Sequence, residues 1–229
     1  MTTARTVAGP SRPLSTMLPR SNAVGTGMLL LVTSAAATLS RFEHPNLGRL
    51  ITPRHYGGES KWSGPWAADN DCFQGFDRKA YLKMLAHLTQ VDTSHLLFVT
   101  APDVVADAGA TLRNFAAWEP MLHDCGFPVA FVGQDGLTIA STPWDDFEAF
   151  FVGGTTEWKL GLAAARLVHE AKSRGKHVHM GRVNSIQRIR YAQAIGCDSI
   201  DGTSFSRFAD TYIPDALAWI GNRQGGLSL

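Results

Sequence analysis

Three carboxylates in this chain each follow a short apolar segment, and that pattern is the first indication of chemistry. They are Asp69, Asp103 and Asp201. An amide, Gln134, and the pair Gly153-Gly154 follow two further apolar segments. One carboxylate can stabilise and capture a positively charged sugar carbon while another carries the proton of the leaving group. A single strand-end Asp is more often a helix cap or turn residue, so the hypothesis depends on these residues meeting.

Histidine and cysteine residues offer weaker candidates. His177 and His179 alternate along one apolar segment and could form half of a metal site, but no third ligand is evident, which favours ordinary packing. Cys72, Cys125 and Cys197 form no CxxC pair, so a thiolate zinc site is not expected. We interpret all three as small core residues in a reducing compartment.

The elements that must position these residues alternate between short apolar segments and longer amphipathic ones. The predicted strands are Met28–Thr33, Arg49–Thr52, Pro65–Ala68, Leu96–Thr100, Val129–Val132, Ala149–Val152, His177–Met180 and Ser199–Ile200. The predicted helices are Asp77–Thr89, Val104–Cys125, Glu157–Arg174, Ser185–Ile195 and Pro214–Ile220, with a possible helical turn over Pro143–Phe147. Gly126, Gly175 and Gly196 stand where helix C-caps are expected.

This alternation predicts parallel strands joined by helices. Eight strands in 229 residues favour a compact, single-domain (β/α)8 TIM barrel, with a doubly wound open sheet as the alternative. We assign residues 26–229 to the barrel and residues 1–25 to a flexible N-terminal arm. A barrel gathers the carboxyl ends of all its strands around one mouth, which would bring the polar residues together.

Composition excludes several classes of protein. With 45% hydrophobic and 18% charged residues, the chain is globular rather than disordered. The net charge of +1 divides into +4 for residues 1–60, −7 for residues 61–149 and +4 for residues 150–229. The longest apolar segment, Met28–Leu39, is shorter than the roughly 20 residues that span a bilayer. We therefore expect no membrane association and a cytoplasmic location, in the host cytoplasm if a phage encodes the protein.

The order of these motifs between Pro65 and Phe208 resembles that of the guanine transglycosylases, the family of tRNA-guanine transglycosylase and its DNA-modifying relatives. The matching segments are Asp69-Asn70-Asp71-Cys72-Phe73-Gln74, Leu97-Phe98-Val99-Thr100-Ala101-Pro102-Asp103, Phe131-Val132-Gly133-Gln134, Gly153-Gly154, Met180-Gly181 and Gly196-Cys197-Asp198-Ser199-Ile200-Asp201. The resemblance implies a TIM barrel that exchanges guanine in a polynucleotide for a 7-deazaguanine.

The resemblance also implies roles for individual residues. Asp201 would be the nucleophile that bonds to the sugar, and Asp69 the general acid and base. Phe73 would stack on the purine and Met180 would line the opposite side of the pocket. The base edge would be bound by Asp103, by Gln134 and by the backbone at Gly153 and Gly154.

Departures from the family pattern bear on the expected cofactor and on the expected substrate. Asn70-Asp71-Cys72 replaces the family's Ser-Gly-Gly, and the tail Ala209–Leu229 lacks the cysteines of the family's zinc motif. We therefore predict no zinc and no cofactor. The chain is as short as the compact phage-type enzymes that insert 7-deazaguanines into DNA. The preferred function is replacement of guanine in DNA by a base such as 7-cyano-7-deazaguanine.

The expected partners are DNA and the free 7-deazaguanine base, and the oligomeric state stays open. Basic residues after the last strands are candidates for phosphate contacts, with a solvated helix surface as the alternative: Lys159, Arg182, Arg188, Arg190 and Arg207. Three other functions are weighed against the first. They are exchange in tRNA, a non-catalytic nucleic-acid-binding subunit, and a hydrolase that removes the base.

Overall fold

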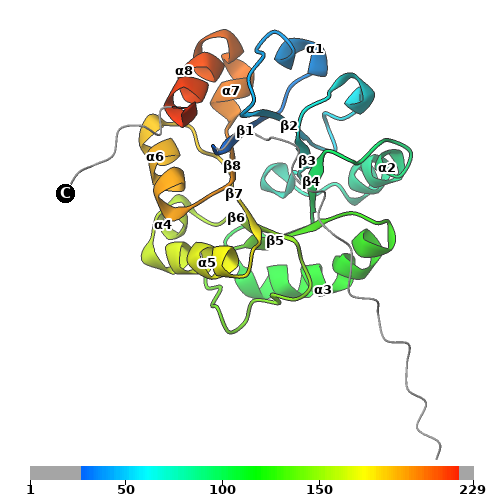
Figure 1. Cartoon of the computed structure of the whole chain (residues 1–229). Helices are drawn as coiled ribbons and strands as arrows, with labels where there is room; N and C mark the ends of the chain where they lie inside the picture. Colours follow the sequence, from blue (N-terminus) through cyan, green and yellow to red (C-terminus); the bar gives the residue numbers. More distant parts are fainter. Residues whose placement is uncertain (1–26, 222–229) are drawn as a thin grey trace, which may run out of the picture.

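Eight parallel strands form a closed barrel in the computed structural model, which describes residues 27–221 (Figure 1). The strands are β1 (Leu29–Val32), β2 (Leu47–Ile51), β3 (Trp66–Ala68), β4 (Leu96–Thr100), β5 (Val129–Gly133), β6 (Ala149–Val152), β7 (His177–Met180) and β8 (Ser199–Asp201). Each strand pairs with the next in the sequence, and β8 pairs back onto β1. The predicted TIM barrel is confirmed, whereas the predicted arm over residues 1–25 lies outside the described residues.

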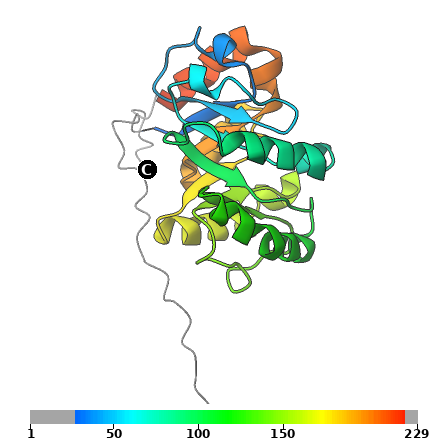
Figure 2. The ribbon, with the colours of Figure 1, turned by 90° about the vertical axis from the view of Figure 1, so that its right-hand side faces the viewer.

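Helices surround the strands, as Figures 1 and 2 show from two directions. They are α1 (Ala36–Leu39), α2 (Arg78–Leu88), α3 (Ala108–Asp124), α4 (Thr156–Lys159), α5 (Leu162–Ser173), α6 (Ile186–Ile195), α7 (Thr203–Arg207) and α8 (Ala209–Gly221), with 3₁₀ turns η1 (Glu59–Lys61) and η2 (Cys72–Gln74). Within residues 27–221, no helix combines the length and the apolar composition needed to cross a bilayer.

Local sequence signals set many helix ends. Side chains of Asp77, Asp107 and Ser185 accept hydrogen bonds from backbone N–H groups in the first turns of α2, α3 and α6. The predicted C-cap glycines also adopt the left-handed backbone conformation that ends a helix, as Gly196 does with φ of 94° after α6.

Four predicted elements were wrong in their extent. The predicted helix Val104–Cys125 begins only at Ala108, as α3. The predicted helix Glu157–Arg174 is two helices, because the backbone leaves the helical path at Leu160 and Gly161 between α4 and α5. The last helix begins at Ala209 rather than Pro214, with the proline inside it. Pro143–Phe147 forms turns, not a helix.

The core has two layers, as side-chain alternation along barrel strands requires. One layer fills the barrel interior and includes Leu31, Phe98 and Phe151, together with the imidazoles of β7. The other packs between strands and helices and includes the remaining buried apolar residues. Of the three cysteines, only Cys197 is buried, and Cys125 is exposed, which corrects the expectation that all three are core residues.

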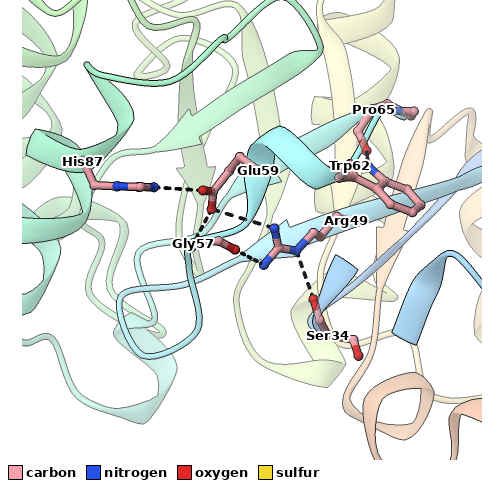
Figure 3. A network of polar contacts seen from close by, with 7 residues as sticks. All are labelled: Ser34, Arg49, Gly57, Glu59, Trp62, Pro65 and His87. Carbon is pink, nitrogen blue, oxygen red and sulfur yellow. Dashed lines mark hydrogen bonds and ion pairs between the residues drawn. The ribbon is translucent and has the colours of Figure 1, made fainter. Parts of the chain in front are cut away.

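A buried polar network fixes the long connection between β2 and β3 (Figure 3). The Glu59 carboxylate accepts a hydrogen bond from Gly57 N–H at 2.7 Å and lies 2.8 Å from Nε2 of His87 on α2. Arg49 on β2 donates to the carbonyl oxygens of Ser34 and Gly57, and its NH1 lies 3.8 Å from Glu59. The network ties this connection to the barrel wall and to the neighbouring helix.

Candidate active site

A cavity of about 80 Å³ opens where the carboxyl ends of the strands meet. The structure brings seven residues singled out from the sequence to its lining: Asp69, Phe73, Asp103, Gln134, Gly153, Arg182 and Asp201. Its other lining residues, not singled out as site residues from the sequence, are Asn70, Val105, Val132, Phe151 and Gly181. Side chains from β3, β4, β5 and β8 or their following loops therefore share one small space.

Asp69 is the carboxylate whose protonation the cavity changes most. Burial, together with the nearby charges of Asp201 and Asp103, raises its pKa to about 8, against a hydrogen bond from Asn70 N–H at 2.9 Å. Asp69 is therefore mostly protonated at neutral pH and can give a proton to a neighbouring group.

Asp103 is held between two amide side chains. Asn70 Nδ2 donates to one carboxylate oxygen at 2.7 Å, and Gln134 Nε2 donates to the other at 2.5 Å. Burial raises the pKa of Asp103, and these hydrogen bonds act in the opposite direction. These hydrogen bonds hold the carboxylate in the cavity lining, where its oxygens can accept only N–H or O–H donors of a ligand.

The side-chain carbonyl oxygen of Gln134 accepts two backbone hydrogen bonds. Its Oε1 accepts from Ala106 N–H at 2.8 Å and from Gly154 N–H at 2.9 Å. The sequence predicts that Gly154 N–H is free for a base carbonyl, and the structure corrects this because Gln134 already accepts from it. Gly154 has φ of 68°, so a side chain at this position would be strained.

Asp201 is oriented by one hydrogen bond to each carboxylate oxygen. His179 Nε2 lies 2.9 Å from Oδ2, and Arg182 N–H donates to Oδ1 at 3.1 Å. Gly181 allows this close approach, since a Cβ there would lie 3.2 Å from Oδ2 of Asp201 and 2.7 Å from the Phe151 ring. The carboxylate plane is fixed with its free lone pairs available to the cavity.

Phe73 stands at the rim with 59% of its surface exposed. The guanidinium of Arg182 lies 4.3 Å from the centre of its ring and also donates to the carbonyl oxygen of Gly154. This stacked pair narrows the cavity mouth. An aromatic ring exposed beside buried carboxylates is typical of a surface that stacks on a planar ligand.

Backbone strain concentrates in the loops of this site. Among the described residues, the non-glycine residues with positive φ are Asp71, Ala106 and Arg182, at 60°, 62° and 60°. They lie in the loops after β3, β4 and β7, and two of them supply backbone N–H groups to Gln134 and Asp201. Strain of this kind is characteristic of functional loops.

The structure corrects the expected roles of two residues. Met180 does not line the cavity: it faces the layer between strands and helices because its neighbour His179 faces the barrel interior. Lys159 is 3% exposed and donates to the carbonyl oxygen of Gly181, so it is not available to phosphates. Burial, with Arg182 nearby, lowers the pKa of Lys159 to about 7.

The remaining basic candidates differ in position. Arg188 NH1 lies 3.4 Å from the carbonyl oxygen of Arg182, close to the mouth. Arg190 stacks on Trp219 of α8 at 4.3 Å, which places its guanidinium on the helical layer and corrects its expected role. Arg207 is exposed at the end of α7.

A second cavity, of about 430 Å³, lies over the ends of β1 and β2. Its basic lining residues are Arg49, Arg54, His55 and Lys61, and no acidic residue lines it in the described part of the chain. Arg54 also contacts Asp71 Oδ2 at 2.7 Å, in the loop that carries Phe73. The contact joins a lining residue of the second cavity to the loop that contributes Phe73 to the first cavity.

Sequence reasoning missed Asn70 and His179. Asn70 was visible as an amide between two carboxylates, and its Nδ2 also donates to the carbonyl oxygen of Ala101 at 2.7 Å. His179 was visible as a polar residue two positions from His177, on the strand beside Asp201. Among residues 27–221, no group of three or more His, Cys, Asp or Glu side chains could hold a metal ion.

Comparison with known protein families and with curated proteins finds no match to this chain.

Proposed function

We propose that the protein is a base-exchange glycosyltransferase that replaces guanine in DNA with a 7-deazaguanine through a covalent bond between Asp201 and the sugar. The observation that carries the proposal is the pairing, in one cavity, of a protonated carboxyl group with an oriented carboxylate. Burial and neighbouring charges keep Asp69 protonated, while two hydrogen bonds orient Asp201. Such a pair suits double displacement at a sugar carbon.

In the first half-reaction the bond between C1′ and the base nitrogen breaks. The developing positive charge on the sugar is stabilised by Asp201, whose carboxylate oxygen then bonds to C1′. The departing guanine takes the proton of Asp69, which becomes a carboxylate. The guanine then leaves and the deoxyribose stays on the enzyme as an ester.

In the second half-reaction the incoming base reverses these steps. Its ring nitrogen bonds to C1′ as the ester bond to Asp201 breaks, and the electron pair returns to the Asp201 carboxylate. The ring N–H proton moves to Asp69, which is again the acid of the next cycle. No external oxidant, reductant or energy source is required.

Asp103 supplies the recognition of guanine. Its carboxylate oxygens are acceptors for the ring N–H and amino group of a guanine-like edge, while Asn70 and Gln134 hold it in place. A base without these donors would leave a buried acceptor unpaired, which costs about 1–3 kcal/mol. Arg182, the cationic donor at the mouth, is available to the base carbonyl once its side chain leaves Phe73.

The second cavity supports a polynucleotide as the substrate rather than a free nucleoside. Arg54, His55 and Lys61 line it, and Arg54 connects it to the loop of Phe73. Arg49 also lines it, with its guanidinium held by the carbonyl oxygens of Ser34 and Gly57. Phosphates beside the extracted nucleotide would find cationic donors there, while the target base leaves the stack to enter the smaller cavity.

Incubation with radiolabelled guanine and either double-stranded DNA, single-stranded DNA or tRNA tests the proposal. We expect label in DNA and, after denaturation, a protein–DNA adduct that is absent with Asp201→Ala. The exposed Asp145→Asn variant is the control, because that carboxylate makes no hydrogen bond in the described structure. An excess of unlabelled 7-cyano-7-deazaguanine should displace the label.

The other functions give different products. Label in tRNA alone would identify a tRNA enzyme. Abasic DNA formed without any added base would identify a hydrolase. Binding of DNA with neither exchange nor adduct would identify a non-catalytic subunit, and each of these three results would overturn the proposal.

A further inference from the structure

Four polar side chains on β7 and β8 form a line of hydrogen bonds inside the barrel that ends on Asp201. His177 Nε2 lies 2.8 Å from Ser199 Oγ, and the same oxygen lies 2.8 Å from His179 Nδ1. His179 Nε2 then lies 2.9 Å from Asp201 Oδ2. His179 and Ser199 are completely buried, so solvent cannot replace these contacts.

The pairing of β7 and β8 determines the positions of these four side chains. β7 and β8 are neighbouring parallel strands (Figure 1), and His179 is the register partner of Ser199. Since side chains alternate along a strand, His177 and His179 share the interior face of β7, and Ser199 and Asp201 share that of β8.

Aromatic packing fixes the imidazole of His179. The ring of Phe151 lies 4.5 Å from it and that of Phe98 lies 5.3 Å from it, both tilted against it. The fixed ring has no alternative partner for Nε2 in this part of the barrel. Its position therefore sets the position of the carboxylate it contacts.

The line has one consistent direction of hydrogen bonding. An ionised Asp201 can only accept, so Nε2 of His179 must carry a proton. With His179 neutral, Nδ1 accepts from the Ser199 hydroxyl, and Ser199 Oγ in turn accepts from Nε2–H of His177. Burial lowers the pKa of His177, which favours its neutral form. Every donor then points toward Asp201, an arrangement in which hydrogen bonds strengthen one another.

We propose that His179 is a positioning residue that orients the Asp201 carboxylate for attack on C1′ and stabilises it when it is expelled from the ester. This inference rests on the proposed function. Charge leaves the carboxylate as its bond to C1′ forms and returns as that bond breaks, so the donor matters most to the expulsion step. Ser199 and His177 hold the His179 ring in the required tautomer.

Three variants test the role. His179→Leu replaces the imidazole with an apolar side chain that has no donor. His179→Gln presents an amide N–H at a similar reach, and Ser199→Ala removes only the hydroxyl between the two imidazoles. We expect the maximal single-turnover rate of adduct release to added base to fall about 100-fold in His179→Leu, and that of adduct formation to fall less. The DNA concentration giving half the maximal rate should change less than threefold. His179→Gln should recover at least tenfold of the loss, and Ser199→Ala should lose about tenfold.

Thermal unfolding of each variant separates positioning from folding. If His179→Leu and His179→Gln unfold at the same temperature and react at the same rate, the positioning role is overturned. A wild-type protein that forms no adduct would overturn the proposed function instead.

A spectroscopic measurement tests the hydrogen bond without activity. In protein labelled with ¹⁵N-histidine, we expect His179 as the Nε2–H tautomer, with its imidazole signals shifted by Asp201→Ala and unchanged by Asp69→Asn. If His179 is the Nδ1–H tautomer, or if its imidazole signals do not change in Asp201→Ala, the inference is overturned even in an active enzyme.

Discussion

Arg182 stacks on the ring of Phe73, with its guanidinium 4.3 Å from the centre of the ring. The same side chain donates to the carbonyl oxygen of Gly154, so it spans the mouth of the cavity from the β3 loop to the β6 loop. A planar ligand that stacks on the same face of Phe73 must take the place of this guanidinium. Under the proposed function, Phe73 and Arg182 would meet the incoming base at the mouth.

Phe73→Ala should weaken substrate binding without weakening the fold. The ring is 59% exposed, so its removal should change the free energy of unfolding by less than about 0.5 kcal/mol. Stacking on an aromatic ring contributes about 1–3 kcal/mol per base, so KM should rise between about fivefold and 150-fold. Steady-state exchange kinetics and chemical denaturation measure the two effects. Phe73→Tyr is the matched control, and an unchanged KM in Phe73→Ala would exclude stacking.

The rate of adduct formation should depend on the protonation of Asp69. Its pKa of about 8 means that the acid form predominates at neutral pH and is lost above pH 8. We expect the single-turnover rate to be nearly constant from pH 6 to 7.5 and to fall about tenfold per pH unit well above 8. Rapid-quench measurements from pH 6 to 9.5 would show this, and a rate that rises through pH 8 would contradict the acid role.

Asp69→Asn should stabilise the protein, and the gain should grow with pH. The folded state keeps Asp69 protonated up to about pH 8, whereas the unfolded chain ionises it near pH 4. Folding therefore takes up a proton between these values, and wild-type stability falls as the pH rises. Asn needs no proton, so the difference in melting temperature should be larger at pH 8 than at pH 5. Asp145→Asn should show no such trend, and a constant difference for Asp69→Asn would refute the raised pKa.

Lys61→Gln should reduce the salt dependence of DNA binding. Each phosphate contact contributes about −0.9 to the slope of the logarithm of the binding constant against that of salt concentration. If Lys61 contacts one phosphate in the second cavity, its removal should make the slope shallower by about 1. Fluorescence anisotropy between 50 and 300 mM salt measures the slope. Lys83→Gln, on the outer face of α2, should leave it unchanged. Equal slopes for the wild type, Lys61→Gln and Lys83→Gln would show that Lys61 does not contact a phosphate.

The strands were predictable within two residues because barrel strands are short apolar segments bounded by turns. β4, β6 and β7 match their predicted bounds. The polar residues after them were also visible, since each ends an apolar segment. The apolar spacing did not predict that the helix is interrupted at Gly161. Apolar residues continue at helical spacing there, although the backbone leaves the helical conformation.

The direction in which a side chain points explains why the roles of some site residues were predicted wrongly. Met180 and His179 are adjacent on β7, so only one of them can face the interior, and the family resemblance had implied Met180. Lys159 looked like a surface cation because burial of a lysine depends on a tertiary partner, here the carbonyl oxygen of Gly181. The contact of Asn70 with Asp103 likewise joins two loops 33 residues apart.

The pairing of β8 with β1 has a consequence for how the protein is made. Leu31 on the first strand is the register partner of Asp201 on the last, so Asp201 is held where the first and last strands of the barrel pair. During synthesis the earlier strands must wait for β8 to leave the ribosome before the barrel can close. Nascent fragments thus contain Asp69 before Asp201, and the candidate site can form only after β8 has been translated.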